Sequence, residues 1–142
     1  MTAPAKPRRR RGAGPEAAVE RQVIAAYRAA GITVYKLSQG FRPEPGGTRQ
    51  TPGIPDLECW HAGRRLLVKH AVKTPAGERE HQRLLARKLI SIPPKQMRRW
   101  HRAQAQQQYA DLCARVGIPY ARGGVSEALA LLTSLGLLEA RS

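Results

Sequence analysis

Residues 53–75, which read GIPDLECWHAGRRLLVKHAVKTP, decide the fold. Two short apolar runs lie on either side of Ala62 and Gly63, a pattern that predicts two strands, over residues 57–61 and 65–73, with a tight connection between them. Asp56 stands at the head of the first strand, and Lys73 stands at the end of the second. We therefore expect Asp56 to meet the end of the second strand across a hairpin.

Side chains alternate between the two faces of a strand, so Ala71 and Lys73 are expected to point to the same side. A lysine there can hold an attacking water or offset negative charge as a point charge. One reaction that uses such a lysine is metal-dependent cleavage of a phosphodiester. It needs oxygen ligands around a divalent cation, and the cation stabilises charge on the phosphate and lowers the pKa of the attacking water. Asp56 offers one carboxylate, but the alanine at position 71 offers none.

The rest of the chain predicts an α/β fold with helices flanking a central mixed sheet. Residues 1–15 are expected to form a disordered basic arm, and residues 16–142 a single domain. Within that domain, periodicity, turn residues and cap residues predict helices over 16–30, 80–90, 95–116 and 127–135, further strands over 32–37 and 118–121, and a loop over 38–55. Ser126 is the expected N-cap of the last helix.

Charge points to a polyanionic partner. The 142-residue chain carries a formal net charge of +15, which favours a polyanion such as a nucleic acid as its partner. The expected phosphate contacts are Arg8, Arg9, Arg10, Arg11, Arg42, Arg49, Arg98, Arg99 and Arg102. The longest apolar stretch, 128–138, is interrupted and too short to span a bilayer, so no membrane association is expected. Two isolated cysteines fit a reduced, cytoplasmic setting. The small size, the single domain and the basic arm suggest a phage or mobile-element gene, and so the cytoplasm of a bacterium or a phage-infected host.

The pattern Gly-Ile-Pro-Asp-Leu, a short hairpin and then Val-Lys-His-Ala-Val-Lys-Thr-Pro resembles the PD-(D/E)xK nuclease superfamily. It is most similar to the VRR-NUC group, with the archaeal-type Holliday junction resolvases nearby. The resemblance covers residues 16–135, apart from a basic helical insertion at 78–102. It implies a restriction-endonuclease-like core and hydrolysis of DNA with Mg²⁺ or Mn²⁺.

The resemblance also implies roles for the hairpin residues. The family's Glu-x-Lys motif falls on Ala71, Val72 and Lys73, which with Asp56 form the catalytic centre. Asp56 and the backbone carbonyl of Val72 would ligate the metal, and Lys73 would position the water. Position 71 holds a glutamate in the family. Arg49 matches an arginine that precedes the family's Gly-x-Pro-Asp turn.

Two further motif positions lie outside the hairpin. A glutamate of the first helix completes the family's metal site; Glu20 matches the resolvases and is our first choice, and Glu16 matches the phage-type VRR-NUC proteins. A glutamine on the helix after the lysine corresponds to Gln106, with Gln82 and Gln104 as competitors.

Three interpretations explain the alanine at position 71. It is an engineered change from glutamate, a natural decay into a DNA-binding protein that no longer cuts, or a shifted motif in which Glu58 supplies the acid. The otherwise intact motif favours the first.

The expected function is a structure-specific DNA endonuclease, resolvase-like, inactive in this chain because of Ala71. The alternatives are a non-catalytic basic DNA-binding protein on a nuclease fold and a VRR-NUC nuclease with flap or nicking specificity. The end of the chain carries more leucines than a small core needs, and we expect the excess to form a homodimer surface: Leu131, Leu132, Leu135, Leu137 and Leu138. Trp60 is expected in the core, and Trp100 as a surface anchor or a platform for an opened base.

Overall fold

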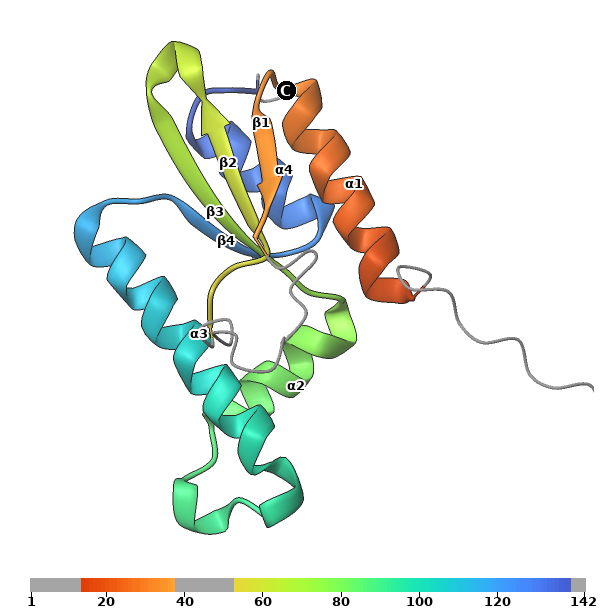
Figure 1. Ribbon diagram of the computed structural model, residues 1–142, viewed down its shortest axis with the longest axis vertical. Helices are drawn as coiled ribbons and strands as arrows, with labels where there is room; N and C mark the ends of the chain where they lie inside the picture. The colour runs from red at the N-terminus through yellow and green to blue at the C-terminus, as the bar shows by residue number, and fades with distance from the viewer. Residues whose placement is uncertain (1–13, 38–52, 139–142) are drawn as a thin grey trace, which may run out of the picture.

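The computed structural model describes residues 14–37 and 53–138 (Figure 1). Its helices and strands follow one another as α1 (Pro15–Ala29), β1 (Thr33–Lys36), β2 (Leu57–His61), β3 (Leu66–Val72), α2 (Pro75–Leu85), α3 (Met97–Val116), β4 (Tyr120–Gly123) and α4 (Val125–Ser134). Single turns of 3₁₀ helix occur at η1 (Ala62–Arg64), η2 (Leu89–Ser91) and η3 (Pro94–Gln96). The expected α/β fold with a central mixed sheet is confirmed.

The sheet has the strand order β1-β2-β3-β4. β1 pairs with β2 and β2 with β3 in antiparallel fashion, whereas β4 lies parallel to β3. The hairpin of β2 and β3 is confirmed, and β2 has the predicted bounds. η1 makes the tight connection between the two strands and ends at Arg65, which adopts a left-handed conformation.

The hydrophobic core lies between the sheet and the helices α1 and α4. Its buried side chains come from α1, the three residues between α1 and β1, β2, β3 and α4: Val23, Ile24, Tyr27, Ile32, Leu57, Cys59, Val68, Val72, Ala128 and Leu132. His70 is also buried on this side, where its Nδ1 lies 2.7 Å from the hydroxyl of Tyr27 and its Nε2 2.9 Å from the carbonyl of Gly123. A histidine with both nitrogens partnered ties α1 to β4, so its role is structural.

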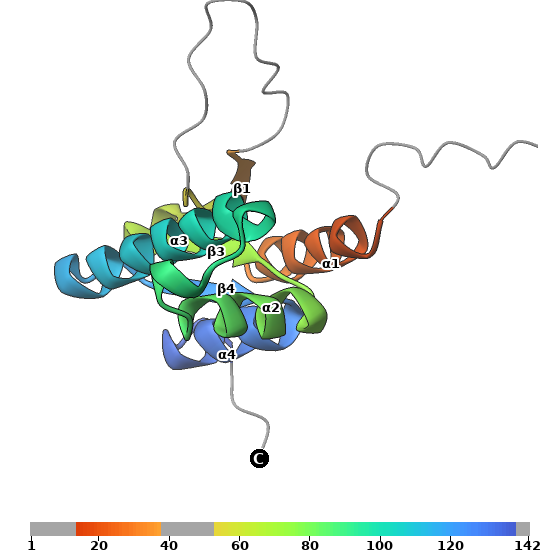
Figure 2. The same ribbon diagram turned by 90° about the horizontal axis from the view of Figure 1, so that it is seen from below.

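The opposite face of the sheet carries polar residues. Figure 2 shows α3 on this side and α4 on the other. Lys69 of β3 and Glu58 of β2 are register partners and form an ion pair at 2.6 Å. Tyr120 of β4 meets Tyr109 of α3, with ring centroids 6.3 Å apart. The helix therefore covers β4 on this face, whereas Trp60 of β2 is exposed.

Several predicted boundaries were wrong for local reasons. α2 begins five residues before the predicted position because Thr74 caps it, accepting a hydrogen bond from the Gly77 amide at 3.0 Å. β4 begins later because the Ile118 amide still bonds to the Cys113 carbonyl of α3. Gly124 stands at the N-cap of α4 in place of Ser126, and Glu127 bonds back to the Gly124 amide at 3.1 Å.

The C-terminal leucines pack inside the molecule. Leu132 is buried in the core, and the other four predicted as a dimer surface pack against that core: Leu131, Leu135, Leu137 and Leu138. These residues therefore give no grounds for a dimer. Within residues 14–37 and 53–138, no helix has the length and apolar character needed to cross a membrane.

Candidate active site

A fixed turn delivers Asp56 to the start of β2. Gly53 has a φ of 86°, and a β-carbon at this position would stand 2.5 Å from a backbone carbon of Ala105 on α3. Only glycine allows this close approach, so α3 fixes the turn. After the turn, the Asp56 carbonyl accepts a hydrogen bond from the Leu37 amide at 2.8 Å, which joins the turn to β1.

The Asp56 side chain meets the end of β3, as the hairpin pattern predicts. Its Oδ2 accepts a hydrogen bond of 2.7 Å from the Val72 amide. Burial, together with the negative charges of Glu16 and Glu20, raises the pKa of Asp56 to about 6, although the Val72 amide and the Lys73 charge lower it. A perturbed carboxyl of this kind is typical of a functional site.

Ala71 and Lys73 flank Val72. Ala71 is buried, and its register partner on β4 is Arg122. Burial lowers the pKa of Lys73, and so does the charge of Arg122, whereas Glu78, Glu16 and Asp56 raise it. Position 71 thus lies between β2, which Asp56 precedes, and β4, which carries Arg122. A carboxylate introduced there would have cations beside it.

The two candidate glutamates of α1 have different surroundings. Glu20 forms an ion pair with Lys36 at 3.1 Å and acts on the pKa of Asp56. Glu16 is exposed, and its charge acts on the pKa values of both Asp56 and Lys73. Both side chains therefore lie on the Asp56 side of α1, and Glu16 influences more of the site.

Sequence reasoning missed an ion pair beside position 71. The guanidinium of Arg122 donates from Nε to Oε2 of Glu78 at 2.8 Å and from Nη2 to Oε1 of Glu78 at 3.0 Å. The same arginine meets Gln107 at 3.5 Å, and Glu78 accepts a bond from Gln82 at 2.9 Å. Glu78 and Arg122 are far apart in the sequence and in no shared pattern, so only the fold brings them together.

His81 on α2 lies close to this ion pair and was also missed. Its side chain is buried, and neither ring nitrogen has a hydrogen-bond partner in the described part of the chain. Burial lowers the pKa of His81 to about 4, with contributions from the positive charges of Arg122 and Lys73. Glu78 and His81 stand three residues apart on one helix face, which was a signal available once the start of α2 was known.

Few candidate magnesium ligands meet at Asp56 in the part of the chain that the structure describes. Among the described residues, no three histidine, cysteine or acidic side chains come together as metal ligands, whereas Mg²⁺ demands an octahedral set of oxygens. Asp56 already gives one oxygen to the Val72 amide. Glu58 does not fill the gap, because its carboxylate binds Lys69 at 2.6 Å and Trp60 at 2.8 Å.

Gln106 was predicted at the centre, and that role stays a prediction. The glutamine of α3 that meets Arg122 is its neighbour Gln107. Three predicted DNA contacts, Arg98, Arg99 and Arg102, are exposed on α3. The other predicted contacts, Arg8, Arg9, Arg10, Arg11, Arg42 and Arg49, lie outside the described residues.

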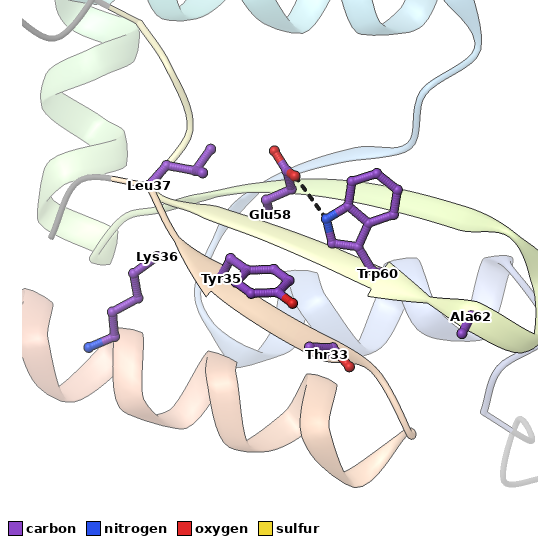
Figure 3. Close-up of a pocket in the computed structure, with 7 residues that line it drawn as sticks. All are labelled: Thr33, Tyr35, Lys36, Leu37, Glu58, Trp60 and Ala62. Atoms are coloured by element: carbon purple, nitrogen blue, oxygen red, sulfur yellow. Dashed lines mark hydrogen bonds between the residues drawn. The ribbon is translucent and has the colours of Figure 1, made fainter.

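A groove of about 700 Å³ extends along β1 and β2 from Leu37, whose amide bonds to the Asp56 carbonyl, to Ala62. Figure 3 shows Tyr35 and Trp60 on the groove side of the strands, whereas Lys36 points toward α1. The side chains of Tyr35 and Trp60 are 57% and 45% exposed, so the expectation that Trp60 is a core residue was wrong. Exposed aromatic faces of this kind can stack on nucleobases.

No protein-family model, curated protein or solved structure matches the chain. The assignment of Asp56, Val72 and Lys73 to a nuclease centre therefore stays a prediction, supported by the sequence pattern and by their contacts. Trp100, the other tryptophan considered for stacking, donates a hydrogen bond to the Arg87 carbonyl at 3.0 Å, which supports its interpretation as an anchor.

Proposed function

We propose that this chain binds branched DNA, as Holliday junction resolvases do, and that it carries an endonuclease centre disabled at position 71. The observation that carries the proposal is the contact of Asp56 with the Val72 amide. Through that contact Asp56, the one acid of the motif, lies against the end of β3. The glutamate and lysine of the family's motif would fall at this end of the strand. Asp56 and Lys73 are in place, and Ala71 is the element that is missing.

The charge of the chain and the shape of its described surface support DNA as the ligand. The net charge of +15 favours a polyanion, and the exposed arginines of α3 supply phosphate contacts without base specificity. The groove with Tyr35 and Trp60 reaches Leu37, whose amide is bonded to the Asp56 carbonyl, so unpaired bases stacked there would approach the candidate centre. A homodimer would suit the two symmetric incisions of a four-way junction and forms part of the proposal.

The same surface supports a second function, a DNA-binding protein without nuclease activity. The shortage of metal ligands in the described part of the chain favours this function for the chain as it stands. The two proposals agree on DNA binding and differ in what position 71 does. Replacing Ala71 with glutamate therefore distinguishes them: cleavage supports the disabled nuclease, and no cleavage supports the DNA-binding protein.

Binding is tested with fluorescently labelled DNA in salt series, using a four-way junction, a flap and a duplex of equal length. We expect the junction to bind at least 10-fold more tightly than the duplex, with an affinity that falls steeply as salt rises. Equal affinity for all three would leave general DNA binding and remove the junction preference. An absence of binding to all three at low salt would contradict the proposal, and analytical ultracentrifugation of the complex would test the dimer.

A further inference from the structure

The connection between α2 and α3 exposes two large aliphatic side chains. Leu89 is 51% exposed and Ile90 is 95% exposed. Figure 1 shows that this connection lies at the end of the described structure farthest from the β2–β3 turn. We refer to Leu89 and Ile90 together as the apolar tip. It falls within residues 78–102, the stretch predicted as an insertion.

The apolar tip is held by a network of backbone bonds. The amides of Ser91 and Ile92 bond to the carbonyls of Lys88 and Leu89 at 2.9 and 3.1 Å. The Ser91 hydroxyl bonds to the Lys88 carbonyl at 2.7 Å, and the Arg87 guanidinium bonds to the Ser91 carbonyl at 3.1 Å.

The base of the connection is also anchored. Ile92 is buried beneath it, and the indole of Trp100 on α3 donates to the Arg87 carbonyl at 3.0 Å. Pro93 and Pro94 follow and restrict the backbone. A loop of this kind presents Leu89 and Ile90 in one conformation, so little ordering is needed when the tip meets a partner.

Positive charge surrounds the apolar tip. No acidic residue occurs between Glu80 and Asp111 in the sequence. Four exposed cations flank the tip in sequence or extend along the first turns of α3: Lys88, Lys95, Arg98 and Arg102. An apolar point with cations beside it matches a ligand that has an anionic outside and an apolar interior.

We infer that the apolar tip is a wedge that enters an opened base step of branched DNA while the cations beside it hold the flanking phosphates. The inference rests on the proposed function, because it takes DNA to be the partner. Proteins that bend DNA insert leucine, isoleucine or proline side chains between base pairs in this way. A branch point is the place where base steps open most readily, since stacking is already interrupted there.

An anionic membrane shares part of this chemistry but fits the tip less well. Two aliphatic side chains bury far less apolar area than one fatty acyl chain, and a single acyl chain gives only marginal membrane binding. A base step, by contrast, is a site of the size of one or two side chains. The membrane therefore becomes an outcome of the test.

The test uses the full chain and a four-way junction with 2-aminopurine next to the branch, where fluorescence rises when the base unstacks. Under saturating protein we expect a several-fold rise for the parent chain, and little or none for Ile90→Ser. The affinity of Ile90→Ser for the junction is expected to fall about 10-fold. The matched control is Val116→Ser, at a side chain 60% exposed on the far end of α3, which should leave both readings unchanged.

Each outcome decides one question. Saturated binding without a fluorescence rise in the parent chain, or an undiminished rise with Ile90→Ser, overturns the wedge and leaves the proposed function in place. An absence of junction binding contradicts the proposed function as well. Ile90-dependent sedimentation with vesicles of phosphatidylglycerol and phosphatidylcholine, without the fluorescence rise, overturns the wedge in favour of a membrane contact.

Discussion

The carboxylate of Asp56 accepts a 2.7 Å hydrogen bond from the backbone amide of Val72. Val72 stands between Ala71 and Lys73, so this single bond fixes Asp56 at the strand end that carries both other motif positions. A backbone amide therefore holds the Asp56 carboxylate at this strand end.

The ionised form of Asp56 destabilises the fold, and its removal should stabilise it. The folded pKa is about 6, above the ordinary value of 3.8. As pH rises from 3.8 to about 6 the unfolded chain releases this proton first, so stability is lost through that range and the loss is constant above it. Asp56→Asn keeps an oxygen for the Val72 amide and removes the charge. We expect it to raise the free energy of unfolding by about 2 kcal/mol at pH 7.5.

Urea denaturation of the parent chain and of Asp56→Asn, at pH 4.5 and pH 7.5, measures this effect. The difference between the two proteins should be clearly smaller at pH 4.5. A variant that is less stable than the parent at pH 7.5 would show that the charged carboxylate supports the fold, contrary to the raised pKa.

The ion pair of Glu78 and Arg122 should contribute more to stability than the ion pairs on the helix surface. Glu78→Gln removes the charge from two hydrogen bonds of 2.8 and 3.0 Å to a mostly buried guanidinium. We expect thermal and urea unfolding to show a loss of about 1–3 kcal/mol. The matched control is Glu80→Gln, whose partners Arg83 and Arg99 are exposed, with an expected loss below about 1 kcal/mol. Equal losses would mean that the pair beside position 71 has no special role.

Gly53 should tolerate substitution less well than Gly117, although both have a positive φ. Their φ angles are 86° and 79°, so alanine meets the same backbone strain at either site. At Gly53 the new β-carbon would also collide with the Ala105 backbone, whereas nothing lies within 4 Å at Gly117. We expect Gly53→Ala to destabilise the protein by at least about 1 kcal/mol more than Gly117→Ala in urea denaturation. Similar losses would show that α3 does not fix the Asp56 turn.

The hairpin could be predicted from sequence because its signals are local. Alternating side chains and a two-residue break fixed the bounds of β2 and the pairing with β3, and so the meeting of Asp56 with the end of β3. The start of α2 also has a local signal, the cap residue Thr74 followed by Pro75. It was not predicted because the first turn of α2 has no apolar stripe.

The surroundings of position 71 could not be predicted, because they depend on tertiary contacts. Arg122 comes beside Ala71 only through the parallel pairing of β4 with β3, and Glu78 reaches Arg122 from a helix whose start was misplaced. Trp60 shows a different limit. The alternation of side chains along β2 predicts that Trp60 lies on the face opposite Cys59. It does not predict whether a helix covers that part of the face, and none of the described helices does.

The central claim is that position 71 lacks the one carboxylate that the centre needs, and Ala71→Glu tests it most directly. The matched control is Ala71→Gln, which has the same size without the charge; circular dichroism and urea denaturation establish that both variants fold. With Mn²⁺ or Mg²⁺, we predict that Ala71→Glu cuts four-way junctions at a rate at least 100-fold above both Ala71→Gln and the parent chain. A folded Ala71→Glu that binds junctions and remains inert on junctions, flaps and duplexes would contradict the account.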